Sequence, residues 1–247
     1  MRYEELPGHP GVVAASVYPN RASAHALAPL LDSGERARAG AFARTPDADR
    51  YVVAHVLLRI VLGAYVDERP DRLVFGRHPC AGCEGPHGKP YLAGHDGAHF
   101  SLSHAGDRVL VAFASVPVGV DVETVPADGL VHDVRSALHP REQRELASLP
   151  ASARAGAFAR CWSRKEAVLK ATGVALTRGA AEPYVGTALD PAQVSGLRLD
   201  DVLLTDGHVA AVAAVAVGVA RPADRAQVAR TPVSATAAIR RDSTRSR

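Results

Sequence analysis

Two short stretches in the second half of the chain carry acidic and basic side chains at spacings that could do chemistry. Asp121 and Glu123 alternate with valines in a stretch typical of a β-strand, so both carboxylates are expected on one face of that strand. Glu166 and Lys170 lie four residues apart in a stretch that predicts an amphipathic helix, so they share a face of that helix. Three carboxylates brought together would form an oxygen-rich site suited to Mg²⁺, which water and a phosphate would complete.

Each pattern alone also has a simpler interpretation. An edge strand can display two acids to water, and a glutamate four residues before a lysine can simply support a helix by roughly 0.2–0.5 kcal/mol. The metal interpretation requires that the strand carboxylates and the helix glutamate occur together, because a site for Mg²⁺ takes its oxygen ligands from more than one element.

Residues that suit a phosphate precede these carboxylates. They share a basic or hydroxyl-bearing side chain or a place in a turn: Arg36, Arg38, Arg50, Lys89, Pro90, Ser103 and His104. Arginine binds phosphate as a two-pronged donor, and Gly88 and Pro90 fix the turn that carries Lys89. Such residues are also common at protein surfaces and in turns that bind no ligand. Only their order along the chain, before the carboxylates, indicates a phosphate site.

The elements expected around these residues occur twice in the same order. The first half predicts a strand, a helix and a hairpin at residues 11–18, 49–65 and 98–115; the second predicts a strand and a helix at 118–125 and 158–172, with a hairpin around Asp206-Gly207. The chain is therefore predicted to be α+β, a pseudo-dimer of two similar halves that meet near Val116. The expected organisation is an N-terminal half over 1–116, a C-terminal half over 117–225 and a disordered tail over 226–247.

The hairpin strand before His104 alternates Phe100 and Leu102 with Ser101 and Ser103. This alternation predicts a half-buried strand, with one apolar face and one polar face.

Composition and charge are those of a soluble globular protein. The 247 residues are 47% hydrophobic and 22% charged. The net charge of +3 comes from residues 226–247, which hold five arginines and one aspartate, so the remainder sums to −1 and gives no argument for a nucleic-acid partner. No signal peptide or membrane-spanning run is recognised, and three cysteines suit a reducing compartment, so we expect a cytoplasmic protein without a membrane partner.

A compact loop offers a second candidate metal site. His78, Cys80, Cys83 and His87 have the residue types and close spacing of zinc ligands. The loop contains only half of the usual pair of ligand motifs, so a Gly/Pro-rich loop without metal is the alternative.

The order of the pieces resembles the 4′-phosphopantetheinyl transferases of the Sfp type. The resemblance covers roughly Asp32 to Leu176 and is carried by the basic helix followed by the stretches GKP, FSLSH, GVDVE and WSRKEAVLKATG. It implies a pseudo-dimer of two α+β halves with coenzyme A between them. The chain departs from the pattern at Glu35, where relatives can carry a basic residue, and at Tyr51, where some relatives carry a small hydroxyl residue.

The resemblance also implies a role for each matched residue. Asp121, Glu123 and Glu166 would hold Mg²⁺ on the pyrophosphate of coenzyme A. The groups that would hold its adenosine and phosphates are Arg36, Arg38, Arg50, Lys89, Pro90, Ser103 and His104, and those that would neutralise phosphate near the metal are Lys165 and Lys170.

The expected reaction transfers the phosphopantetheine arm to a serine of an apo acyl or peptidyl carrier protein and releases adenosine 3′,5′-bisphosphate. Glu166 would take the serine proton, with Lys170 beside it. The carrier would serve fatty-acid, polyketide or nonribosomal-peptide synthesis and would dock between Val131 and Arg160, where Leu138, Leu146 and Phe158 could offer apolar contact to it. The enzyme is expected to be a monomer.

Two other functions stay open at this point. One is a zinc-knuckle module that binds nucleic acid through the arginine-rich tail. The other is a Mg²⁺-dependent pyrophosphatase that hydrolyses coenzyme A without any carrier.

Overall fold

The computed structural model describes residues 1–80, 84–86, 88–126, 137–174, 181–204 and 207–216. The elements before the midpoint are β1 (Glu4–Glu5), β2 (Val12–Ser16), α1 (Val17–Ala26), η1 (Ala28–Leu30), α2 (Ser33–Gly40), α3 (Thr45–Val66), η2 (Pro70–Arg72), β3 (Phe75–Arg77), β4 (Pro90–Leu92), β5 (His99–Ala105) and β6 (Arg108–Ala114). Those after it are β7 (Val118–Thr124), α5 (Pro140–Ser148), α6 (Ala151–Thr172), β8 (Leu197–Val202) and β9 (His208–Val215).

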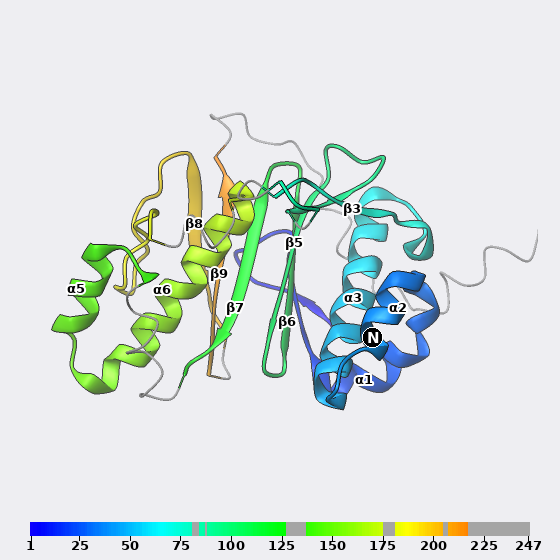
Figure 1. The fold of residues 1–247 in the computed structure, drawn as a ribbon, viewed down its shortest axis with the longest axis horizontal. Helices are drawn as coiled ribbons and strands as arrows, with labels where there is room; N and C mark the ends of the chain where they lie inside the picture. Colours follow the sequence, from blue (N-terminus) through cyan, green and yellow to red (C-terminus); the bar gives the residue numbers. More distant parts are fainter. Residues whose placement is uncertain (81–83, 87, 127–136, 175–180, 205–206, 217–247) are drawn as a thin grey trace, which may run out of the picture.

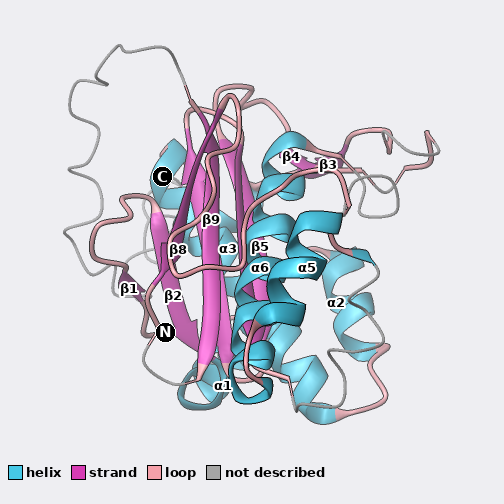
Figure 2. Ribbon diagram, turned by 90° about the vertical axis from the view of Figure 1, so that its left-hand side faces the viewer, coloured by secondary structure: helices cyan, strands magenta, loops and turns pink. Residues whose placement is uncertain are grey.

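Two antiparallel sheets form the centre of the molecule. Their strand orders are β1-β2-β6-β5 and β7-β9-β8, and a small third sheet pairs β3 with β4. Strands β5 and β7 lie side by side where the two sheets meet, with α3 on the side of the first sheet and α6 on the side of the second (Figure 1). The view turned by 90° shows α5 and α6 along one side of the strands (Figure 2). The predicted α+β class is confirmed.

The two halves repeat one plan. In the first, β2 pairs with β6 and β6 with β5; in the second, β7 pairs with β9 and β9 with β8. The long helices α3 and α6 both have 22 residues, and each ends at a left-handed residue, Asp67 and Gly173 respectively. This repeat is the pseudo-dimer that the order of the predicted elements indicated.

Two serines join the sheets at the seam between β5 and β7. The Ser101 hydroxyl accepts a hydrogen bond from the Val120 amide at 3.0 Å, and the Ser103 hydroxyl accepts one from the Val122 amide at 3.3 Å. Both serines are buried, so the strand face that the alternation predicted to be polar is covered by β7. Their hydroxyls satisfy amides that would otherwise lack a neighbouring strand backbone.

Helix α6 lies unusually close to β7 because Gly119 has no side chain. A Cβ atom at this position would lie 2.0 Å from the Ala167 carbonyl oxygen and 2.4 Å from the Ala171 amide nitrogen. Both are backbone atoms of α6, which cannot move away independently of the helix. Gly119 thus allows residues of α6 to reach the next residues along β7.

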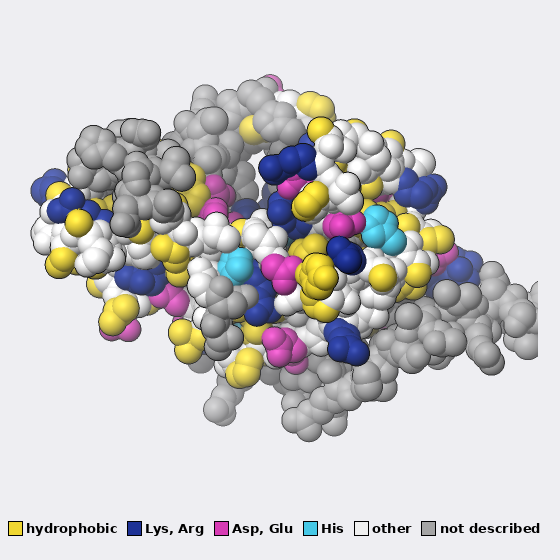
Figure 3. Space-filling view, turned by 90° about the horizontal axis from the view of Figure 1, so that it is seen from below, with side chains coloured by type: hydrophobic (Ala, Val, Ile, Leu, Met, Phe, Trp, Pro, Cys, Tyr) yellow, Lys and Arg dark blue, Asp and Glu magenta, His cyan; other side chains and the backbone are white. Residues whose placement is uncertain are grey.

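Three apolar clusters fill the space between helices and strands, one under α3, one under α6 and one that crosses the seam through β7. Among the described residues, no helix has both the length and the apolar character needed to cross a membrane. On the face seen from below, acidic, basic and apolar side chains are interspersed (Figure 3). The predicted tail over 226–247 lies outside the described residues.

Candidate active site

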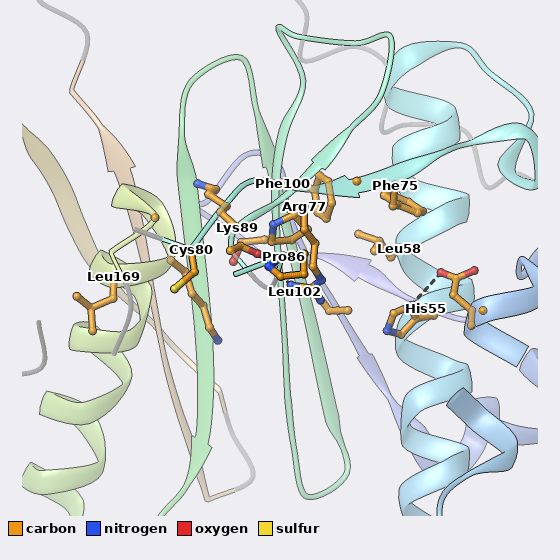
Figure 4. A pocket seen from close by; sticks show the side chains of 18 of the residues that line it. His55, Leu58, Phe75, Arg77, Cys80, Pro86, Lys89, Phe100, Leu102 and Leu169 are labelled. Atoms are coloured by element: carbon orange, nitrogen blue, oxygen red, sulfur yellow. Dashed lines mark hydrogen bonds and ion pairs between the residues drawn. The ribbon is translucent and has the colours of Figure 1, made fainter. Parts of the chain in front are cut away.

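A cavity of about 1070 Å³ lies between the two halves. Its walls come from α2, α3, the segment from β3 to β5, and the last turns of α6. Figure 4 shows Leu169 on α6 at one side and His55 and Leu58 on α3 at the other, with Lys89 and Pro86 between them. Four of the predicted site residues line it: Lys89, Pro90, Glu166 and Lys170.

The predicted carboxylates come together at the α6 end of this cavity. Asp121 and Glu123 lie on the face of β7 opposite Val120 and Val122, which pack into the apolar cluster at the seam. Glu166 reaches the same place from α6, and the charges of the three acids affect one another's ionisation. The close packing over Gly119 is what brings the helix and the strand within reach.

Asp121 is buried and has one oxygen occupied and one without a partner. Its Oδ1 accepts hydrogen bonds from the Ser103 hydroxyl at 2.8 Å and from the Lys170 ammonium at 2.6 Å. Its Oδ2 is also buried and has no hydrogen-bond partner among the described residues. Burial raises the pKa of this carboxyl, and the ammonium of Lys170 opposes the rise.

The other two carboxyl groups are also shifted toward the neutral form. Partial burial, then the charges of Asp121 and Glu166, raise the pKa of Glu123 to about 7. Burial and the charge of Asp121 raise the pKa of Glu166. Three carboxylates that repel one another, with a buried oxygen that lacks a donor, form a set that a divalent cation would stabilise.

These residues fit Mg²⁺ in chemistry, although they do not form a closed cage. Among the described residues no three His, Cys, Asp or Glu side chains are arranged as a complete metal site. The Lys170 ammonium donates to Asp121 Oδ1, where it supplies the positive charge that a metal ion would otherwise supply. It also donates to the Ser103 hydroxyl at 3.2 Å. An open set of carboxylates suits Mg²⁺, which keeps several ligands for water and substrate phosphate.

Lys89 lies at the boundary of the two halves. Its ammonium donates to the Val118 carbonyl at 3.1 Å and to the Ala171 carbonyl, near the end of α6, at 2.9 Å. Burial lowers its pKa to about 8. Two of its three N–H groups are therefore engaged with backbone, while its side chain lines the cavity.

Arg50 and His104 lie close together at the end of the β5–β6 hairpin. The Arg50 guanidinium donates to the Gly106 carbonyl at 2.9 Å and to Asp47 at 3.1 Å. Loss of surrounding water lowers the pKa of His104, and interactions with Arg50, His55 and Lys170 lower it further. These contacts place Arg50 and His104 on the same side of the molecule as the carboxylates.

Three predicted ligands lie elsewhere. Arg36 donates to the Leu31 carbonyl, and the Arg38 guanidinium lies 5.3 Å from the centre of the Phe42 ring; both side chains are exposed and outside the described cavity lining. Lys165 is buried, with its ammonium 2.7 Å from Glu142 and 2.5 Å from the Pro183 carbonyl. The expectation that Lys165 contacts phosphate is therefore corrected, because a buried carboxylate already neutralises it.

The expected carrier-docking contacts are also corrected. Leu138, Leu146 and Phe158 are 0%, 1% and 7% exposed and belong to the apolar cluster under α6, so they cannot offer a docking surface. Apolar residues in an amphipathic helix face the nearest core, which here is their own half. Residues 127–136, the rest of that expected region, lie outside the described residues.

The cavity has a wall that sequence reasoning missed. Tyr51 and His55 stack with their ring centres 4.0 Å apart, and His55 is held by Glu35 at 3.0 Å. Burial raises the pKa of Tyr51 to about 12. The Glu35 carboxylate also accepts a hydrogen bond from the buried Arg59 guanidinium at 2.7 Å. The only sequence signals were the departures at Glu35 and Tyr51, and neither indicated this network.

The candidate zinc loop is only partly described. Cys80 is buried against the cavity and the His78 ring lies 4.7 Å from the Tyr91 ring, whereas Cys83 and His87 lie outside the described residues. Among the described residues no group of potential zinc ligands is found.

Comparison with known proteins gives the family. Residues 117–213 match the model of the 4'-phosphopantetheinyl transferase superfamily. HetI of Nostoc sp., named a 4'-phosphopantetheinyl transferase, is 31% identical over 200 residues, which are 78% of this chain and 81% of HetI. The chain belongs to this superfamily, as the sequence motifs indicated.

Two further relatives match over a shorter stretch. A putative 4'-phosphopantetheinyl transferase of Synechocystis sp. is 31% identical over 61% of this chain, and the 4'-phosphopantetheinyl transferase psf-1 of Bacillus pumilus is 32% identical over 62%. The matched stretch spans about 60% of the length of each of these two relatives.

Proposed function

We propose that this protein transfers the 4′-phosphopantetheine group of coenzyme A to a serine of an apo acyl or peptidyl carrier protein. The observation that supports this most is the cluster of Asp121, Glu123 and Glu166 at one end of a large cavity between the two halves. In the reaction, the serine oxygen bonds to the phosphorus that carries the pantetheine arm. The bond from that phosphorus to the bridging oxygen breaks, and adenosine 3′,5′-bisphosphate leaves.

The carboxylates Asp121, Glu123 and Glu166 would hold Mg²⁺. When bound, this ion would neutralise the pyrophosphate and polarise its oxygens. The buried Asp121 Oδ2, which has no partner among the described residues, is the oxygen best suited to such a ligand.

Glu166 is the proposed general base. Its raised pKa makes the ionised carboxylate a stronger proton acceptor than an ordinary glutamate, and it lines the cavity. It would take the serine proton directly or through one water. Lys170, which also lines the cavity, would place its positive charge beside the transferred phosphoryl group.

The remaining phosphates and the adenosine would lie along the cavity toward the first half. Lys89 and Pro90 line this path, and Arg50 and His104 supply cationic or donor groups at the end of the β5–β6 hairpin. Ser103 acts on Asp121 and Lys170, so its role is to orient them. We further propose a cytoplasmic monomer that acts on carriers of fatty-acid, polyketide or nonribosomal-peptide synthesis.

The test is to incubate the protein with coenzyme A, Mg²⁺ and a panel of apo-carrier proteins and to weigh the carriers by mass spectrometry. Addition of one phosphopantetheine group to a carrier, lost when its serine is replaced by alanine, supports the proposal. Release of adenosine 3′,5′-bisphosphate without any carrier would instead indicate a pyrophosphatase. No reaction with any carrier or with coenzyme A alone would contradict the proposal.

A further inference from the structure

Each half contains a fully buried cation at the same place in its long helix, and the second half buries the neighbouring Arg164 as well. Arg59 in α3 and Lys165 in α6 both lie seven residues before the last helical residue, and they are 0% and 1% exposed. Each forms an ion pair of 2.7 Å with a buried glutamate, Glu35 and Glu142 respectively. The repeat of this arrangement in two halves with different sequences indicates that it serves the fold of each half.

The two glutamates also occupy the same local position. Glu35 is the third residue of α2 and Glu142 the third residue of α5, and each side chain accepts a hydrogen bond from the backbone of its helix N-cap. One carboxylate thus fixes the start of a short helix and pairs with the cation of a long one. This explains why both partners tolerate burial, since each charge is compensated and hydrogen-bonded.

In the second half the pair connects three segments. Glu142 Oε1 accepts from the Val185 amide at 2.8 Å, while the Lys165 ammonium also donates to the Pro183 carbonyl at 2.5 Å. Helix α5, helix α6 and the segment around Val185 are therefore joined at one point. Figure 1 shows that α6 lies between α5 and β7, so this point is on the opposite side of α6 from the carboxylates.

Lys165 and Glu166 are consecutive in α6 and point about 100° apart around its axis. A fixed direction for Lys165 therefore fixes the rotation of the helix, and with it the direction in which Glu166 points. We propose that Lys165 is a positioning residue, which acts through its buried pair with Glu142 to hold Glu166 and Lys170 toward Asp121. It does not touch coenzyme A. This inference rests on the proposed function, because it assigns Lys165 a role in that reaction.

The experiment is a double-mutant cycle on kinetics, with Glu142→Gln, Lys165→Met and the two together. Glu142→Gln is the milder change, because a glutamine oxygen can still accept from Val185 or from the N-cap backbone. The reaction is measured with coenzyme A, Mg²⁺ and an apo-carrier that the parent protein modifies, well below the melting temperature of every variant. A matched control, Val56→Ala, removes buried volume in the first half and lowers stability away from the site.

We expect both single variants to lower kcat by about 10- to 100-fold, as a misplaced catalytic group would, while KM for coenzyme A changes by less than about twofold. The double variant should be no slower than the slower single variant, because each residue acts through the other. The low-pH limb that Glu166, as a base, gives to the pH dependence of kcat should move in the same variants. Val56→Ala should change neither kcat nor this pH dependence.

Two results would overturn the inference. One is a large rise in KM for coenzyme A in Lys165→Met with Glu142→Gln unaffected, since Lys165 would then contact a phosphate. The other is unchanged kcat in a folded Glu142→Gln protein, since the pair would then not position Glu166. If Lys165→Met fails to fold, the kcat of Glu142→Gln alone decides, and an unchanged value overturns the inference. A parent protein that modifies no carrier would contradict the proposed function instead.

Discussion

The two halves of this molecule share one arrangement of strands and helices but carry different side chains at equivalent positions. Counted from the residues that follow each hairpin turn, Arg108 in β6 and His208 in β9, strand β2 corresponds to β7. Val13 then stands where the second half has Asp121, and Ala15 stands where it has Glu123. Both members of the first pair are buried, but Val13 packs into an apolar cluster, whereas Asp121 meets a lysine and a serine.

The long helices differ in the same way. Counted back from the ends of α3 and α6, Ile60 corresponds to Glu166 and Ala64 to Lys170. The first half therefore has apolar residues at these four positions, of which Ala64 is exposed, and the second half has four charged ones. The shared elements carry the fold, and a small number of substitutions on one strand and one helix turn an ordinary core contact into a candidate site.

The largest expected effect tests whether the charge at Glu166 is what distinguishes the halves. Glu166→Gln keeps the size and polarity of the side chain but removes the base, so turnover should fall by about 10²- to 10⁴-fold while the protein stays folded. The matched change in the first half, Ile60→Leu, should leave turnover unchanged. Both are measured by the mass of the modified carrier over time and by circular dichroism. A Glu166→Gln protein that works at the parent rate would show that this glutamate only supports the helix.

The next effect tests the close approach of α6 to β7. Gly119→Ala places a methyl group against two backbone atoms of α6, so we expect a loss of about 3 kcal/mol in the free energy of unfolding, at the upper end of overpacking effects. Transfer should fall as well, because the carboxylates separate. Gly156→Ala in the same helix meets nothing within 4 Å and should stabilise the protein by up to about 1 kcal/mol. Denaturant unfolding of both variants provides the measurement, and equal stabilities would refute the packing argument.

Much of this frame could be predicted from sequence because the signals are local. The alternation around Asp121 predicted a strand at 118–125, which the structure gives as Val118–Thr124, and helical spacing placed Glu166 and Lys170 on one face of α6. The repeat of strand, helix and hairpin predicted two similar halves. Spacing alone was enough here, since residues two apart in a strand or four apart in a helix share a face in any fold.

The remainder depends on contacts between segments that are distant in the chain. The family resemblance implied that Lys165 lies beside phosphate. Its partner Glu142 lies in another helix, however, and only the packing of α5 on α6 brings the two together. The burial of Ser101 could not be predicted from the alternation, because a single strand does not reveal that β7 lies beside it. The wall formed by Tyr51 and His55 has the same cause, because its shape depends on Glu35 from α2.

The smallest effect concerns the pH dependence of stability, which should differ between the halves. In the folded protein the pKa of Glu123 is raised from its ordinary value of 4.5 to about 7, by burial first and then by Asp121 and Glu166. The folded state therefore binds more protons than the unfolded state between these two values. Without Mg²⁺, stability should fall as pH rises from about 4.5 to about 7, by roughly 1 kcal/mol after allowance for the partial exposure of this side chain.

Mg²⁺ should reverse this trend, because it binds the ionised carboxylates and so stabilises the folded state most where they are deprotonated. Hydrogen exchange of backbone amides, corrected for the intrinsic pH dependence of exchange, measures the effect separately in each half of the molecule, with β7 and β9 reporting on the second half. Protection in β7 and β9 should fall toward pH 7 without Mg²⁺ and recover with it, and Glu123→Gln should remove most of the fall. The β2 and β6 amides, beside Val13 and Ala15, should show little of either effect. Equal pH and Mg²⁺ responses in both halves would mean that the carboxylates do not set the two halves apart, since β2 has no acid at either corresponding position.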